Sequence, residues 1–425
     1  MELYVCVIIF SIINIIVSTF LSNSILHPTR LFVTFWTILI SMTIIFYRTK
    51  YEWDYIGLLW IEIAILFMTI GGILAKTIKF KKMYCLLGQV NGTLENICRY
   101  NWKVLIIVII IGLVSPIFSL TENGFSINDV LSLSGIINVS STSAIMRYSE
   151  SRSVSTVHQI ASIFTYACAL CGGYTYNYAK EKVEKVLSMA TMLPIILEMV
   201  FTSGKSGFIA AIILWIGGWC ISYKRIHAEL PRIKMKIYVL LLGVIVMLYG
   251  VLFLVMLLRT GNFSSEMVDI ITEKFWKEYA FGPIIGFDAW FLRRNTQEFD
   301  IGSNTYMTLF RMIGLVNRQG GIYDVLISEY GNVFTVFRGV ISDFGIIGGI
   351  IYCFFRGIVT QLCYNSIDGY YLYAVFPMMI IACSYFWNLY GFIVSPWVYT
   401  SYIMAIIVYG IFILMFHKII NVRKI

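Results

Sequence analysis

The chain has 425 residues, of which 59% are hydrophobic and only 13% are charged, and its mean hydropathy is +0.81. Soluble globular domains have about 45–50% apolar and about 25% charged residues, so this composition excludes a water-soluble fold. It predicts an all-α polytopic membrane protein. The formal net charge of +9 is assigned to cytoplasmic loops, where Lys and Arg gather, and nucleic acid is not an expected partner.

Eleven apolar segments are expected to form spanning helices, each of which needs about 20 residues. The first begins at Leu3 and is expected to be retained, because neither a basic leader nor a small-residue cleavage site accompanies it. The segments lie near residues 3–22, 30–47, 53–75, 104–120, 157–177, 186–201, 207–222, 236–257, 333–355, 369–387 and 396–416.

The basic loops predict the orientation of these spans. Residues 76–103 carry six Lys or Arg against one acid, residues 223–236 carry five against one, and the C-terminal tail is also basic. All three are predicted to be cytoplasmic. Four spans separate the first two loops, so the Ser-rich stretch 127–146 is expected to lie at the outer surface without crossing.

Two outward loops follow from this arrangement, residues 121–156 and residues 258–332. The second has 75 residues, including seven basic and nine acidic side chains and many aromatic ones. Structureless loops of this length are uncommon. Because Met267, Ile271 and Phe275 fall on one helical stripe, part of the loop is predicted to be an amphipathic helix.

Motifs of several enzyme classes are incomplete or absent. Gly204-Lys205-Ser206 resembles the end of a phosphate-binding loop, but Met199 stands where that loop requires Gly. The four histidines lack metal-ligand spacing, and no Gly-x-Ser-x-Gly elbow is present. The nine cysteines do not suggest a disulfide framework. We therefore expect no nucleotide cofactor and no metal.

The most informative segment is residues 330–349, which begins a span and yet contains four polar side chains in its outer half, Asn332, Thr335, Arg338 and Asp343. At 100° per residue, three of them share a helix face and Arg338 lies at its border. Ionisable groups at membrane depth usually face a cavity or one another. The segment forms either a polar wall beneath the outward loop, or an interfacial arginine with an aspartate satisfied between helices.

The run from Asn332 through Thr335 and Asp343 to Gly349 resembles the signature of the Wzy-type O-antigen polymerases, which join oligosaccharide repeat units. Other segments resemble that family in order: His27–Arg30 before Trp36, Arg147-Tyr148, Thr202–Ser206, Tyr279–Asp288 and Gly302–Tyr306. Lys205 stands where the family usually has an arginine, and a lysine keeps the charge but loses the bidentate fork.

The resemblance implies a GT-C-like membrane glycosyltransferase in the bacterial inner membrane, with its active site facing the periplasm. Such an enzyme transfers the growing glycan from undecaprenyl diphosphate to the non-reducing end of the next lipid-linked unit. Donor and acceptor are thus both undecaprenyl-diphosphate-linked oligosaccharides. The donor is already activated by its diphosphate, so no further cofactor is needed. A polysaccharide chain-length regulator is a further expected partner.

Residue types can be matched to this reaction. Arginines suit the leaving diphosphate, because they form bidentate hydrogen bonds to it, and a carboxylate or histidine suits deprotonation of the acceptor hydroxyl. The substrate-binding candidates are Arg147, Arg259, Arg311, Arg338, Lys205, Asn332 and Thr335; the catalytic candidates are Asp343 first, then His158 and Asp288.

Each candidate also has a structural interpretation. An arginine can lie at the membrane interface or in a loop salt bridge, and His158 can be a polar residue at a helix start. Asp343 can pair with Arg338 or cap a helix break at Gly345.

Two other functions stay open on the sequence. A ligase with similar topology would transfer the glycan to lipid A core, but the 332–349 segment favours a polymerase. A flippase or other transporter of lipid-linked oligosaccharides would usually have short outer loops and two matched halves. The long outward loop and the absence of a visible duplication argue against it.

Overall fold

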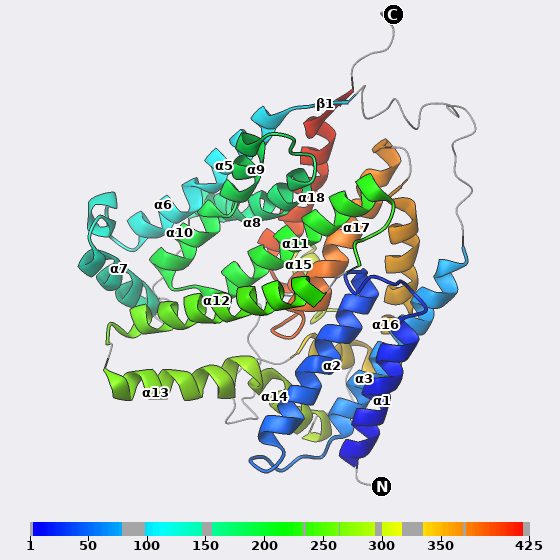
Figure 1. The fold of residues 1–425 in the computed structure, drawn as a ribbon. Coiled ribbons are helices and arrows are strands. Elements are labelled where there is room, and N and C mark those ends of the chain that lie inside the picture. The colour runs from blue at the N-terminus through cyan, green and yellow to red at the C-terminus, as the bar shows by residue number, and fades with distance from the viewer. Residues whose placement is uncertain are drawn as a thin grey trace, which may run out of the picture.

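The computed structural model describes residues 3–78, 98–146, 155–232, 235–262, 264–293, 300–316, 335–368 and 371–419. These residues are almost entirely helical (Figure 1), apart from one antiparallel pair of three-residue strands. The elements are α1 (Leu3–Ser18), α2 (Pro28–Tyr47), α3 (Ile56–Lys76), β1 (Cys98–Tyr100), α5 (Trp102–Gly112), α6 (Val114–Glu122), η1 (Ile127–Val130), α7 (Leu133–Met146), α8 (Thr156–Tyr176), α9 (Lys182–Ala190), α10 (Leu193–Thr202), α11 (Lys205–His227), α12 (Met235–Thr260), α13 (Ser265–Lys274), η2 (Phe275–Ala280), α14 (Gly282–Arg293), α15 (Met307–Met312), α16 (Val336–Ser366), α17 (Tyr371–Tyr390), η3 (Pro396–Val398), α18 (Thr400–Phe416) and β2 (His417–Ile419).

Seven helical segments in the described part of the chain are long and apolar enough to cross a membrane. They are Pro28–Tyr47, Ile56–Lys76, Trp102–Glu122, Lys182–Thr202, Lys205–His227, Val336–Ser366 and Tyr373–Tyr390. The chain is therefore a polytopic helical membrane protein. Helices α1, α8, α12 and α18 lie at the other four predicted spans, but the total of eleven crossings and the GT-C-like fold stay predictions.

Two of the predicted spans are each divided into a pair of short helices. The segment 104–120 is divided into α5 and α6 at Leu113, and 186–201 into α9 and α10 at residues 191–192. Pro116 and Pro194 lie in the first turn of the second helix of each pair. Because proline has no N–H to donate to the preceding turn, the helical hydrogen-bond ladder is interrupted there.

The helices pack into two groups (Figure 1). One has its core between α1, α2, α3, α14 and the first half of α16, and the other between α5, α8, α10, α11, α17 and α18. Helix α16 lies against α3 so closely that a Cβ at Gly357 would be 1.9 Å from the Met68 carbonyl oxygen. Small residues of this kind allow helix backbones to approach within a membrane.

The loops gather at two ends of the bundle. At one end, Arg225 Nη1 donates to the Ile367 carbonyl over 2.9 Å, and Cys98 pairs with Ile419. At the other end, the Val336 N–H donates to the Gly391 carbonyl over 2.7 Å, and Ser395 Oγ donates to the Thr305 carbonyl. The described parts of the predicted cytoplasmic segments lie at the first end, and those of the predicted outward loops lie at the second. Which end faces the cytoplasm stays a prediction.

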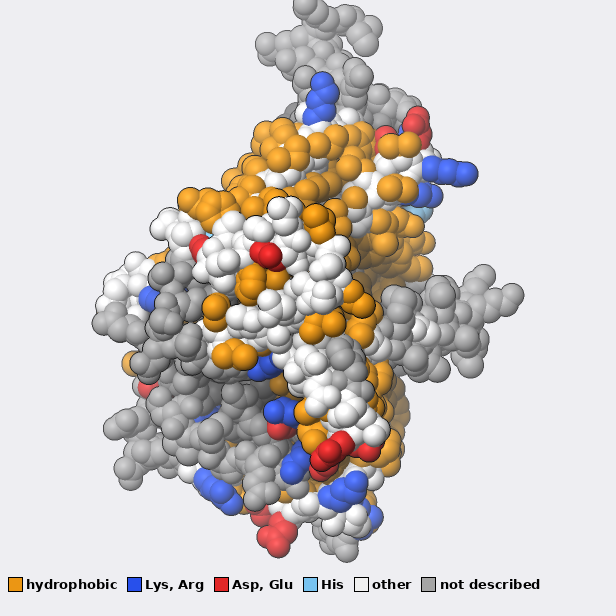
Figure 2. All heavy atoms as spheres, turned by 90° about the vertical axis from the view of Figure 1, so that its left-hand side faces the viewer, with side chains coloured by type: hydrophobic (Ala, Val, Ile, Leu, Met, Phe, Trp, Pro, Cys, Tyr) orange, Lys and Arg blue, Asp and Glu red, His pale blue; other side chains and the backbone are white. Residues whose placement is uncertain are grey.

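Many side chains exposed along the spanning helices are apolar, among them Ile45, Phe67, Ile107, Ile110 and Phe355. Figure 2, which faces the left-hand side of Figure 1, shows hydrophobic side chains over the upper half, whereas most of the Lys, Arg, Asp and Glu lie lower. In the predicted outward loop, α13 is an amphipathic helix, as the sequence predicted. Ile271 is buried against Met256 and Leu257 of α12, with Met267 and Phe275 beside it.

Candidate functional site

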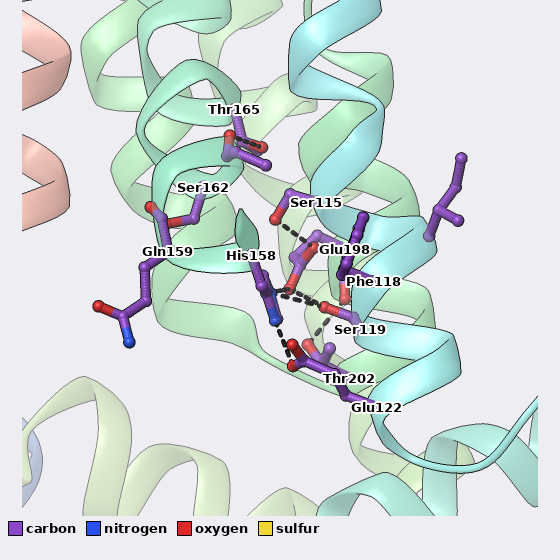
Figure 3. Close-up of polar contacts among 12 residues, drawn as sticks. Ser115, Phe118, Ser119, Glu122, His158, Gln159, Ser162, Thr165, Glu198 and Thr202 are labelled. Atoms are coloured by element: carbon purple, nitrogen blue, oxygen red, sulfur yellow. Dashed lines mark hydrogen bonds and ion pairs between the residues drawn. The ribbon is translucent and has the colours of Figure 1, made fainter. Parts of the chain in front are cut away.

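A polar cluster joins α6, α8 and α10 near the end of the bundle that holds the predicted outward loops (Figure 3). Ser155 caps α8 by accepting a hydrogen bond from the His158 N–H over 3.2 Å. This cap fixes the first turn of α8, so that the His158 side chain points toward α6 and α10. Ser115, Ser119 and Glu122 face it from α6, because residues spaced by four and three share a helix face.

The His158 ring lies between two carboxylates. Its Nδ1 is 2.6 Å from Glu122 Oε2, and its Nε2 is 3.7 Å from Glu198 Oε1. Ser119 Oγ is 3.1 Å from Nε2 and donates to Glu198 Oε1 over 2.6 Å, while Ser115 Oγ donates to the other oxygen of Glu198. The Glu122 carboxylate also accepts the Ser155 N–H over 3.0 Å. The imidazole is thus held by hydrogen bonds on both nitrogens.

The exposure of this cluster decides which groups a substrate can reach. Ser119 is fully buried and its hydroxyl is used by Glu198, so it is not placed as a nucleophile. The His158 side chain is 7% exposed, whereas Glu122 and Glu198 are 15% and 20% exposed. A carboxylate that is hydrogen-bonded to a histidine can accept a proton and share it with the imidazole. Acid–base chemistry, rather than attack by serine, is what this geometry supports.

A cavity of about 420 Å³ lies on the opposite face of the same helix. Thr156, Gln159 and Ser162 of α8 line one side, and Arg311, Tyr399 and Thr400 line the other. Arg311 donates from Nη2 to Thr400 Oγ1 over 2.9 Å. Figure 3 shows Gln159 and Ser162 pointing away from His158. The cavity and the cluster therefore share the exposed N-terminal turn of α8 but not a common wall.

Two further predicted cations lie at the same end of the bundle, each against an aromatic ring. Lys205 Nζ is 3.9 Å from the centre of the Tyr279 ring, and Arg338, which is 7% exposed, has its guanidinium carbon 5.3 Å from the centre of the Trp290 ring. Arg259 is half-buried near the C-terminus of α12. Thr335 is buried at the N-cap position of α16.

Asp343 anchors a loop. Its Oδ1 accepts hydrogen bonds from the backbone N–H and the side-chain amide of Asn304, and its Oδ2 accepts the backbone N–H of Thr305 over 2.6 Å. The residue is 2% exposed. The helix break expected at Gly345 is present, with φ 73° and ψ −178°. These contacts favour a structural interpretation, in which Asp343 holds residues 304–305 against α16.

Asp288 has a similar role in α14. It is fully buried, and its Oδ2 accepts the backbone N–H groups of Asp54 and Tyr55 over 3.2 and 3.3 Å, where α3 begins. Burial raises the pKa of Asp288 to about 6, even though these hydrogen bonds act in the opposite direction.

The predicted site residues that the structure describes therefore do not form a single site. His158 is the catalytic candidate that lies in a cluster of titratable groups, and Arg311 is the arginine that lines a cavity. Arg147 and Asn332 lie outside the described residues.

Sequence reasoning missed Glu122, Glu198 and Ser119. The signal was present in part, because Glu198 lies within an apolar run that was predicted to span the membrane, where a carboxylate indicates a functional or paired group. The spacing of Ser115, Ser119 and Glu122 on an apolar helix was a second signal. Neither pattern shows that the two helices meet at His158.

Within the described part of the chain, no group of three His, Cys, Asp or Glu side chains could hold a metal ion. Comparison with protein-family models, with curated proteins and with solved structures found no match for this chain.

Proposed function

We propose that the chain is a membrane glycosyltransferase that polymerises lipid-linked oligosaccharide repeat units, as the sequence resemblance implies. The observation that carries the proposal is the first turn of α8, which has a histidine between two carboxylates on one face and a cavity with an arginine on the other. Transfer of a glycan from a lipid diphosphate requires both a base and a cation.

We assign the leaving diphosphate to Arg311. The guanidinium lies at a cavity lined by hydroxyl, amide and aromatic side chains, which suits a phosphate with a sugar attached. Thr400 holds the arginine through one N–H, so other N–H groups of the fork can donate to phosphate oxygens. Charge that develops on the diphosphate as the anomeric bond breaks is then stabilised by a fixed cation.

We assign deprotonation of the acceptor hydroxyl to the pair formed by His158 and Glu122. The exposed first turn of α8 joins the two features, because Thr156 lines the cavity and Ser155 bonds Glu122. In this assignment, the acceptor sugar lies at that turn. Its proton passes to the more exposed Glu122 carboxylate, which is hydrogen-bonded to His158 Nδ1, so that carboxylate and imidazole share the proton.

The surface polysaccharide of cells that lack this protein tests the proposal. A polymerase-deficient cell is expected to display single repeat units on lipid A core, with no ladder of longer chains, and restoring the gene should restore the ladder. Glycan that accumulates on the lipid carrier without reaching lipid A would indicate a ligase. A complete absence of exported units would indicate a flippase. Either of these two results would contradict the proposal.

A further inference from the structure

A second cavity, of about 280 Å³, lies at the end of the bundle opposite the candidate site. It is bounded by the α1–α2 connection at residues 19–24, the last turn of α3, the C-terminal end of α11 with the loop at 228–232, and the last turns of α16. These four segments are far apart in the sequence. The loop segments are joined by a hydrogen bond from Ser24 Oγ to the Pro231 carbonyl over 2.7 Å.

Positive charge predominates around this second cavity. Lys76, Lys224 and Arg232 line it, and Glu229 is the acid among the described lining residues. Lys224 is 6% exposed and pairs with Asp368 at 2.5 Å. Lys76 and Arg232 are exposed, and Lys76 Nζ donates to the Phe20 carbonyl over 2.8 Å.

A fourth cation approaches from α2 and adds to the positive field. Arg30 Nη1 donates over 2.8 Å to the carbonyl of Ser22, which lines the cavity. The positive charges also affect the pKa of His27, which is buried at the N-cap position of α2. Its pKa is lowered to about 3, first by burial and then by the positive charges of Lys76, Lys224 and Arg30. The field of these side chains therefore favours an anion at this place.

Exposed apolar side chains neighbour the lining residues of the second cavity in the sequence, near the C-terminal ends of α1 and α3. Phe20, Leu74 and Ile78 are 64%, 55% and 49% exposed. They flank Lys76, and Asn365 of α16 contacts the Ile78 carbonyl at 3.5 Å. In a membrane protein, exposed apolar side chains at the end of a spanning helix face acyl chains. An anion bound here could therefore carry a lipid tail.

We propose that this second cavity binds a phosphate group, carried by an anionic phospholipid whose acyl chains lie along the exposed apolar face of α1 and α3. Basic pockets between transmembrane helices are suited to anionic headgroups. A free phosphate ion has the same chemistry and is distinguished by the test below. The proposal does not depend on the enzymatic activity, since the cavity lies at the other end of the bundle.

The test compares thermal unfolding of the purified protein in detergent with added dioleoyl phosphatidylglycerol, with dioleoyl phosphatidylcholine, and with potassium phosphate against potassium chloride of equal ionic strength. Phosphatidylglycerol should raise the melting temperature of the wild type and phosphatidylcholine should not. Lys76→Gln with Arg232→Gln should weaken the apparent affinity for phosphatidylglycerol on the order of tenfold or more, given about 1 kcal/mol for each cation. Both side chains are exposed, so folding should be kept, and Arg232→Gln alone should show an intermediate response.

The matched control is Lys182→Gln with Lys185→Gln, which removes two exposed cations from α9 without changing the cavity lining. The control should respond to phosphatidylglycerol as the wild type does. A shift with potassium phosphate alone that is lost in the cavity variant would assign the same site to a soluble phosphate. An equal response of the cavity variant, the control and the wild type to phosphatidylglycerol would overturn the proposal.

Discussion

The Asp343 carboxylate accepts three N–H donors from Asn304 and Thr305, and these contacts favour a structural role. Asp343→Asn would place an amide group where one oxygen now accepts a hydrogen bond. A buried donor left without its acceptor costs about 1–3 kcal/mol. We expect the melting temperature and the yield of the variant to fall together with its activity.

The control for this substitution is Asp300→Asn. The Asp300 side chain is exposed and accepts a hydrogen bond from the Asn304 side-chain amide, so the variant should melt close to the wild type. If Asp343→Asn instead melted like the wild type but failed to elongate glycan, Asp343 would again be the first candidate for the base.

His27 makes stability depend on pH. Its pKa in the folded protein is about 3, whereas the ordinary value is 6.5. As the pH falls below 6.5, the unfolded chain binds a proton that the folded chain does not, so the folded state loses stability until about pH 3. Between neutral pH and pH 5 this loss amounts to about 2 kcal/mol.

His27→Gln should remove this component, so its melting temperature should fall less than that of the wild type between pH 7.5 and pH 5. His227→Gln replaces an exposed histidine and should follow the wild type. Parallel curves for His27→Gln and the wild type would contradict the assignment.

At the scale of elements, the break in α16 depends on Gly345. Its φ of 73° with ψ of −178° belongs to a region that is essentially restricted to glycine. Gly345→Ala is therefore expected to destabilise the protein by about 1–3 kcal/mol. Gly250→Ala in α12 is the control, because a Cβ there meets no atom within 4 Å. Thermal unfolding of both variants measures the difference, and an unchanged melting temperature for Gly345→Ala would show that α16 can straighten.

The positions of the helices follow from the sequence, whereas the points at which helices are interrupted do not. Apolar runs of about 20 residues require helices in a membrane, and a helix is present at each predicted span. The divisions at Leu113 and at residues 191–192 depend on single prolines, and the 31-residue α16 extends beyond its apolar run. Such details depend on packing partners that a linear pattern does not specify.

In the candidate site, too, the sequence indicates single residues but not the contacts that packing creates. His158 and Arg311 were predicted as site residues, because their charge type suits the proposed reaction. Glu122 and Glu198 were not, because their contact with His158 depends on how α6, α8 and α10 pack. For Asp343 the sequence leaves a catalytic and a structural role open, because it does not show the three N–H donors that residues 304–305 bring to the carboxylate.

At the scale of the whole molecule, we propose glycan transfer at one end of the bundle and binding of an anionic phospholipid at the other. One end holds the His158 cluster and the cavity beside Arg311, and the other holds the cationic cavity between α1, α3, α11 and α16. Exposed apolar side chains of the spanning helices lie between the two ends.

The most direct test of the account is elongation by the purified protein in lipid nanodiscs, supplied with undecaprenyl-diphosphate-linked repeat units and no nucleotide sugar. The wild type should yield lipid-linked products of two and more units, resolved by mass. His158→Gln should yield none even though the variant folds, because the neutral amide cannot share the proton that Glu122 takes up. Intact single units after incubation with folded wild-type protein would contradict the proposed polymerase activity.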